Sequence, residues 1–172
     1  ADGFKPTLAF VFISLKQDWA AVSNQLDQRG IRIFGATSGG EFIDGEIGAG
    51  TIAILLVDMN PAHFLLLLDD YSDNDPTELA KDMAAKAKSQ FEKPSFILSC
   101  SMDVKSETER LLWEPLIKAI ESITGHETII WGGRAGDDFM YNETLVFTNS
   151  QSTKSGIVML AVDGDKILVK GL

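Results

Sequence analysis

Two glycine-rich segments hold most of the side chains that could bind a ligand or do chemistry. Residues 35–42 read Gly-Ala-Thr-Ser-Gly-Gly-Glu-Phe, and residues 132–139 read Gly-Gly-Arg-Ala-Gly-Asp-Asp-Phe. Each segment follows a predicted strand, and glycine there permits a positive φ and a close approach of backbone to a ligand. Hydroxyl, carboxylate and guanidinium groups stand between the glycines. We therefore predict that the two segments together form a binding site.

The charged groups of these segments suggest which ligand the site would take. Arg134 is the sole arginine or lysine in either segment, and its planar fork suits a carboxylate. Asp137 and Asp138 could accept hydrogen bonds from an ammonium group, although Asp137 could instead cap the turn. We expect a small carboxylate-bearing metabolite, an amino acid first. The alternative is that both segments are tight turns with solvated acids. The predicted ligand-binding residues are Thr37, Ser38, Gly39, Glu41, Gly133, Arg134, Gly136, Asp137 and Asp138.

Catalysis is not the activity that the sequence favours. Ser38, Cys100 and Ser101 are candidate nucleophiles, but each needs an activating base. The two histidines, His63 and His126, lie near none of them in the sequence. A cysteine at a strand end is more often a small buried residue than a reactive thiol. We predict a non-catalytic domain, with a hydrolase using Ser38 or Cys100 as the alternative.

No metal or organic cofactor is predicted. Glu41 and Asp138 would make a carboxylate pair suited to a metal or to proton transfer, but solvated turn acids are the simpler interpretation. The first segment lacks the Gly-x-Gly-x-x-Gly spacing, and no capped helix clearly follows, so a dinucleotide site is not indicated. Residues 73–75 begin like a calcium loop, yet Pro76 occupies a key position, and capping of a helix explains them.

Composition places the chain among ordinary globular domains. It has 172 residues, of which 45% are hydrophobic and 23% charged, typical of one soluble domain. The lone Cys100 excludes an intrachain disulfide, and the apolar runs are far too short to span a membrane. A net charge of −10 without a stripe of arginines disfavours nucleic acid. We predict a cytoplasmic domain with no membrane or nucleic-acid partner.

The apolar pattern predicts an α/β fold with two repeated βαββ-like units, forming mixed or packed sheets with helices outside. We favour two packed sheets, with the last three strands as an antiparallel meander. Pro115 should kink the third helix or divide it. The predicted helices cover about residues 17–29, 76–91 and 106–123, and the predicted strands 8–13, 31–34, 51–57, 64–68, 96–98, 128–131, 144–148, 156–162 and 167–169.

The two halves of the chain, about residues 6–58 and 94–163, match each other element by element. Gly35 aligns with Gly132 and Gly39 with Gly136, at a constant offset of 97 residues. Ser14 likewise ends the strand before the first segment, as Ser101 does before the second. This shared order predicts an internal duplication that brings the two segments together.

At the two glycine-rich segments the sequence resembles the FIST N domain (F-box and intracellular signal transduction). The strands at 144–149 and 156–162 fit those expected after its second conserved block, and the likeness runs from about Pro6 to the end. The resemblance implies a single FIST N-like domain over residues 1–172, acting as a small-ligand sensor joined to a signalling output domain. It also implies a C-terminal FIST half that is absent from this sequence. A further alternative to a ligand sensor is therefore a structural half-domain that pairs with that C-terminal half.

Overall fold

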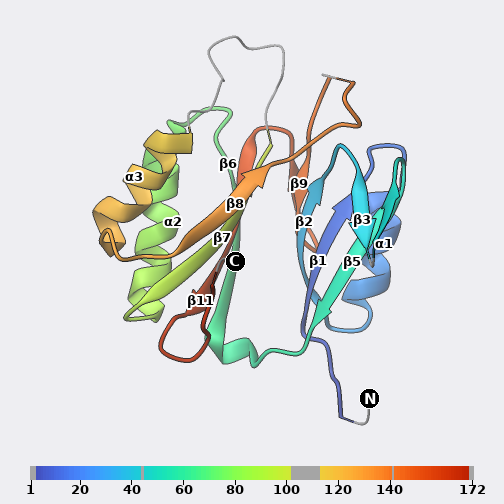
Figure 1. Ribbon diagram of the computed structural model, residues 1–172. Helices are drawn as coiled ribbons and strands as arrows, with labels where there is room; N and C mark the ends of the chain where they lie inside the picture. Colours follow the sequence, from blue (N-terminus) through green and yellow to red (C-terminus); the bar gives the residue numbers. More distant parts are fainter. Residues whose placement is uncertain (1–2, 44, 102–112, 141, 171–172) are drawn as a thin grey trace.

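The computed structural model describes residues 3–43, 45–101, 113–140 and 142–170. Two mixed β-sheets face each other, and the helices lie on their outer sides (Figure 1). This arrangement confirms the predicted α/β class with helices outside. One 3-10 turn, η1 (Pro61–His63), leads the chain from the first sheet to the second.

The first sheet combines a parallel βαβ unit with an antiparallel edge strand. Helix α1 (Trp19–Asp27) packs on its outer face through Trp19, Val22 and Leu26. The helix begins at Asp18, whose carboxylate accepts a hydrogen bond from the backbone of Ala21. The strands in spatial order are β10 (Ser152–Thr153), β9 (Val146–Phe147), β2 (Arg32–Thr37), β1 (Leu8–Ile13) and β5 (Ile52–Val57).

The second sheet has the same kind of parallel unit and two helices on its outer face. Helix α2 (Pro76–Gln90) begins at the predicted cap Asp75, and its alanine-rich face is buried against the sheet beside α3 (Trp113–Thr124). Pro115 is the third residue of α3 as the structure describes this helix. The strands in spatial order are β6 (Phe64–Asp70), β11 (Gly156–Asp163), β7 (Pro94–Cys100) and β8 (Ile130–Arg134).

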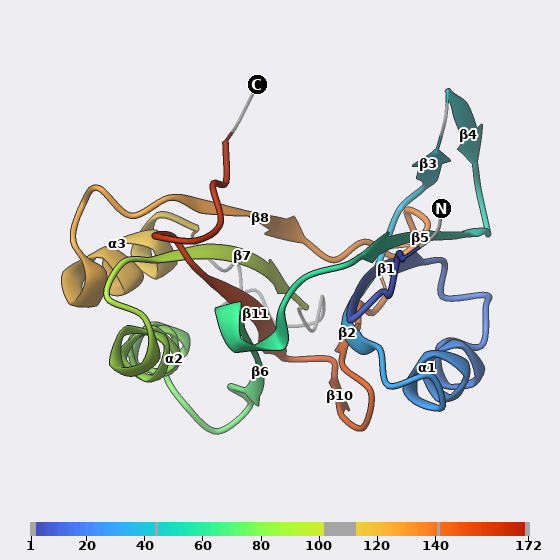
Figure 2. The ribbon, with the colours of Figure 1, turned by 90° about the horizontal axis from the view of Figure 1, so that it is seen from below.

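A shared apolar core holds the inner faces of the sheets together. Phe34 from β2 packs in one cluster with Phe64 and Leu160 from the second sheet. Beside this core a small hairpin, β3 (Glu41–Ile43) and β4 (Glu46–Gly48), forms a separate two-stranded sheet. Figure 2 shows the hairpin extending away from the layers.

The two parallel units agree in strand order, direction and register. β1 and β2 pair in parallel with β5 antiparallel on the far side of β1, and β7, β8 and β11 repeat that order. Gly35 lies opposite Val11 in β1, and Gly132 lies opposite Leu98 in β7. These matches support our proposal of a duplication, and superposition of the two units remains its test.

Two predicted features are wrong. The last strands form no meander, because β9 hydrogen-bonds to β2 in the first sheet whereas β11 lies in the second. Residues 167–169 are not a strand; Ile167 and Val169 pack on the core without a ladder partner. The kink or division predicted at Pro115 stays a prediction, because residues 106–112 of that predicted helix lie outside the described part.

Candidate functional site

The glycine-rich segments begin as strand and not, as predicted, as loop. Strand β2 continues to Thr37, and β8 continues to Arg134. A Cβ atom on Gly35 would lie 2.3 Å from the ring of Phe147, and one on Gly132 would lie 2.2 Å from the carbonyl oxygen of Leu98. The first glycine of each segment is therefore explained by close packing within the sheets.

The ends of the two segments contact each other directly. The Gly136 N–H donates to the Thr37 carbonyl oxygen at 2.8 Å, and the Asp138 N–H donates to that of Ser38 at 3.3 Å. A Cβ on Gly136 would lie 2.5 Å from the backbone nitrogen of Gly39. Backbone hydrogen bonds and steric contact thus join the two sheets where the segments meet.

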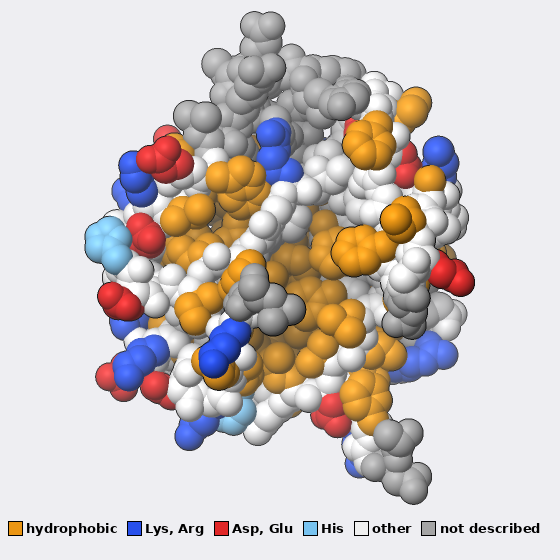
Figure 3. Space-filling model, viewed as in Figure 1, with side chains coloured by type: hydrophobic (Ala, Val, Ile, Leu, Met, Phe, Trp, Pro, Cys, Tyr) orange, Lys and Arg blue, Asp and Glu red, His pale blue; other side chains and the backbone are white. Residues whose placement is uncertain are grey.

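A cavity of about 320 Å³ lies between the segments. Figure 3 shows hydrophobic side chains gathered in a hollow at the centre of the face that it draws, between the two sheets. We call this cavity the cleft. Six of the nine predicted ligand-binding residues line it, and three do not. Its lining residues are Phe12, Phe34, Ala36, Thr37, Ser38, Gly39, Ile97, Leu98, Ser99, Gly132, Gly133, Arg134 and Gly136.

Of the described residues that line the cleft, Arg134 is the charged one. It is exposed, and it forms no ion pair or side-chain hydrogen bond with any of the residues the structure describes. An unpaired guanidinium presents five N–H donors in a rigid fork that matches a carboxylate. The cleft therefore has a group that could bind an anion and that has no ion-pair or side-chain hydrogen-bond partner within the described part of the chain.

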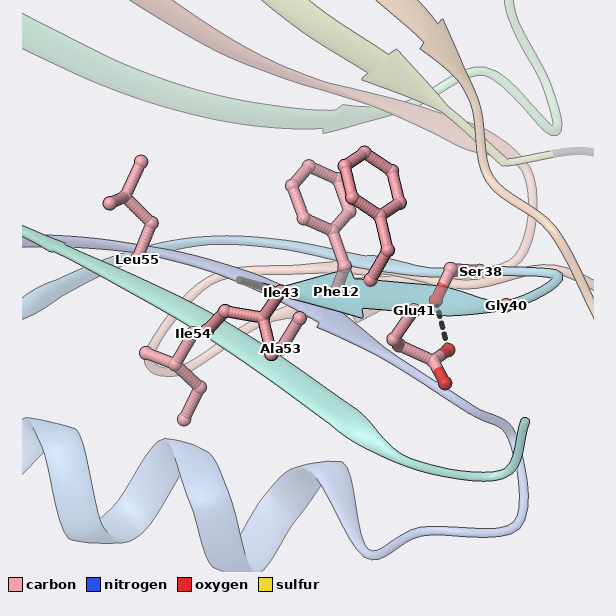
Figure 4. A pocket seen from close by; sticks show the side chains of 9 residues that line it. Phe12, Ser38, Gly40, Glu41, Ile43, Ala53, Ile54 and Leu55 are labelled. Carbon is pink, nitrogen blue, oxygen red and sulfur yellow. Dashed lines mark hydrogen bonds between the residues drawn. The ribbon is translucent and has the colours of Figure 1, made fainter. Parts of the chain in front are cut away.

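Glu41 does not line the cleft. Its carboxylate holds the first segment in place through hydrogen bonds. One carboxylate oxygen accepts from the Ser38 hydroxyl at 2.5 Å (Figure 4). The other accepts from the Thr51 backbone N–H at 3.0 Å and from its hydroxyl at 2.7 Å. Because three donors already hold this buried carboxylate, its evident role is to fix the turn between β2 and β3.

Asp137 and Asp138 line a different cavity, of about 390 Å³, together with Lys16. That cavity shares no lining residue with the cleft. Asp137 accepts from the backbone N–H of Asn142 at 2.6 Å, which is the turn-capping role left open by the sequence. Asp138 accepts from the Ser14 hydroxyl at 2.7 Å. The structure therefore separates the two aspartates from Arg134.

The structure also bears on the alternative in which Glu41 and Asp138 form a carboxylate pair for a metal ion. Glu41 and Asp138 line different cavities. Across the described part of the chain, no three His, Cys, Asp or Glu residues are grouped to hold a metal ion. The carboxylate pair therefore has no common cavity around which to act.

Sequence reasoning missed a third cavity, of about 480 Å³ beneath the β3–β4 hairpin. Its signal was the Asp44-Gly45 dipeptide, a common hairpin turn, flanked by apolar residues. Phe12 and Ser38 line both this cavity and the cleft, so the two adjoin. We call it the apolar cavity. Its lining residues are Phe12, Ser38, Gly40, Glu41, Phe42, Ile43, Ala53, Ile54 and Leu55.

Two of the three candidate nucleophiles are buried, and neither histidine shares one of the three cavities with any of them. Cys100 is 1% exposed, and burial raises the pKa of its thiol to about 12. Ser101 is buried, and its hydroxyl donates to a backbone carbonyl at 3.0 Å. His63 and His126 each lie beside a carboxylate instead, at 3.5 and 3.1 Å, and neither lines any of the three cavities. Among the described residues, neither histidine is therefore placed as a base for Ser38 or Cys100, and the carboxylate that accepts from the Ser38 hydroxyl, Glu41, is also held by Thr51.

Comparison with known families gives one match. The FIST N domain model matches residues 7–171, and this range contains both glycine-rich segments. No curated protein sequence matches the chain. Within the described residues, no helix is long and apolar enough to cross a membrane. The cytoplasmic location stays a prediction.

Proposed function

Because the chain belongs to the FIST N domain family, a family of sensory domains in signal transduction, we propose that it binds a small carboxylate-bearing metabolite in the cleft. Amino acids are included in this class. The observation that carries the proposal is the guanidinium of Arg134, which has no ion-pair partner among the described residues and lies in the lining of a cavity shared by both glycine-rich segments.

The charge of the whole chain makes this one cation important. A net charge of −10 repels an anion unless a local positive group overrides the field. Arg134 is positioned to do so, since no carboxylate among the described residues neutralises it. A cavity of about 320 Å³ lies at the small end of ligand sites, which span about 300–1,000 Å³. A metabolite of modest size is therefore the appropriate ligand.

The position of the cleft suggests how binding would be transmitted. Its lining comes from β1 and β2 in one sheet and from β7 and β8 in the other. A ligand that contacts both sheets would stabilise one relative arrangement of them, because it binds that arrangement best. We propose that a signalling output domain or a C-terminal FIST half detects this change.

The test is calorimetric titration of a panel of amino acids and simple carboxylates against three proteins. Arg134→Ala should weaken binding by about 1.5–3 kcal/mol, the scale of a hydrogen bond to a charged group. Arg29→Ala is the matched control, since it removes the same charge from an exposed residue that lines none of the three cavities. The control should bind like the wild type.

Two results would overturn the proposal. Equal losses in Arg134→Ala and Arg29→Ala would mean that only the overall charge matters. No binding of any carboxylate by the wild type would favour the structural half-domain, whose cleft is covered by a partner.

A further inference from the structure

The cleft and the apolar cavity adjoin each other and have chemically different linings. Phe12 and Ser38 line both of them. In Figure 4 the side chains of Phe12 and Leu55 rise on the same side of the sheet, whereas Ile54 points to the opposite side, where α1 lies. A molecule in the cleft that extended past Phe12 would therefore reach the space beneath the hairpin.

Each of the two linings contains one charged side chain among the described residues. Arg134 carries a positive charge in the cleft, and Glu41 carries a negative charge in the apolar cavity. Both oxygens of Glu41 already accept hydrogen bonds from Ser38 and Thr51. The rest of the apolar cavity is lined mainly by hydrocarbon side chains.

This lining suits a carboxylate better than a zwitterion. Among the described residues, an ammonium group in the cleft would meet no carboxylate in the lining, because Asp137 and Asp138 line the separate cavity beside Lys16. A buried charge without a partner is unfavourable. An aliphatic or aromatic tail, in contrast, gains from leaving water for the apolar cavity.

We propose that the ligand is an amphipathic monocarboxylate, with its carboxylate on Arg134 and its apolar tail passing Phe12 into the apolar cavity. The inference rests on the proposed function and narrows its ligand class. It also assigns a function to the β3–β4 hairpin, whose Phe42 and Ile43 cover the tail.

The test compares four probes by calorimetric titration: butyrate, octanoate, 2-aminooctanoate and octan-1-ol. Octanoate should bind most tightly. Each methylene added between butyrate and octanoate should improve affinity about fourfold, which corresponds to about 0.8 kcal/mol per buried methylene. Arg134→Ala should weaken octanoate at least tenfold and leave octan-1-ol unchanged.

A matched pair of substitutions in β5 tests whether the apolar tail lies in the apolar cavity. Leu55 is 62% exposed and lines the apolar cavity, whereas Leu56 is 39% exposed and lines none of the three cavities. Leu55→Ser should weaken octanoate about tenfold without affecting butyrate. Leu56→Ser should change neither, and circular dichroism should show that both variants are folded.

The outcomes separate the inference from the proposed function. Tighter binding of 2-aminooctanoate than octanoate, still dependent on Arg134, would leave the proposed function standing and overturn the inference. Equal affinity for butyrate and octanoate would also overturn the inference alone. If no probe binds the wild type, both are overturned, and a partner protein becomes the expected occupant of the hollow.

Discussion

Substitution of Gly136 tests whether contact between the two segments builds the cleft. A Cβ there would lie 2.5 Å from the backbone nitrogen of Gly39 and 2.9 Å from the carbonyl carbon of Ser38. Both are backbone atoms, so no side-chain rotation relieves the clash. Overpacking of this kind costs about 1–3 kcal/mol. Displacement of the hydrogen bond from the Gly136 N–H to Thr37 would add to it.

Gly133→Ala is the matched control for Gly136→Ala. Gly133 also lines the cleft, but a Cβ on it would meet no atom within 4 Å. Neither glycine has a positive φ, so the two variants differ mainly in steric contact. Urea unfolding followed by tryptophan fluorescence should give Gly136→Ala a free energy of unfolding about 2–3 kcal/mol below wild type, and Gly133→Ala one within about 0.5–1 kcal/mol of it. Equal losses in the two variants would refute the reasoning.

Three further predictions concern single side chains. Because burial raises the Cys100 pKa to about 12, a thiol reagent at pH 8 should modify the folded protein far more slowly than the urea-unfolded chain. Glu41→Gln should lower the free energy of unfolding by about 1–3 kcal/mol, since an amide NH₂ would face a donor on Ser38 or Thr51; an unchanged urea midpoint would contradict this. Hydrogen bonds from Thr77 lower the pKa of Asp75, so its contribution to stability is complete above the unfolded carboxyl pKa and is lost as the pH falls through the lower folded value. Thermal unfolding of Asp75→Ala should show the deficit at pH 7 but not at pH 2.

Local sequence signals predicted the framework of the fold well. The run at 8–13 forms β1, and the Asp75-Pro76 start forms α2, because hydrophobic period and capping are local properties of the chain. Strand β9 was assigned to the wrong sheet, since its two-residue pairing with β2 depends on tertiary contact. Residues 167–169 have the pattern of a strand but lie on the core without a neighbouring edge.

Part of the candidate site was also predictable from the sequence. The predicted repeat indicated that the two segments form one site. In the structure, a backbone hydrogen bond from Gly136 to Thr37 joins them. The repeat in the sequence could not show that Asp138 and Phe139 take positive φ values of 54° and 61°, conformations that turn the chain there. Such values are uncommon for residues other than glycine. Sequence spacing alone therefore left Asp137 beside Arg134, whereas the folded chain places them on different cavities.

The central claim, that the cleft is the ligand site, is tested most directly by backbone amide NMR during titration with octanoate. The largest shift changes should fall on Ser38, Gly39, Gly133 and Arg134, which line the cleft. The amide of Asn142, in the separate cavity, should stay unchanged. Changes confined to that second cavity, or none at saturating octanoate, would contradict the account.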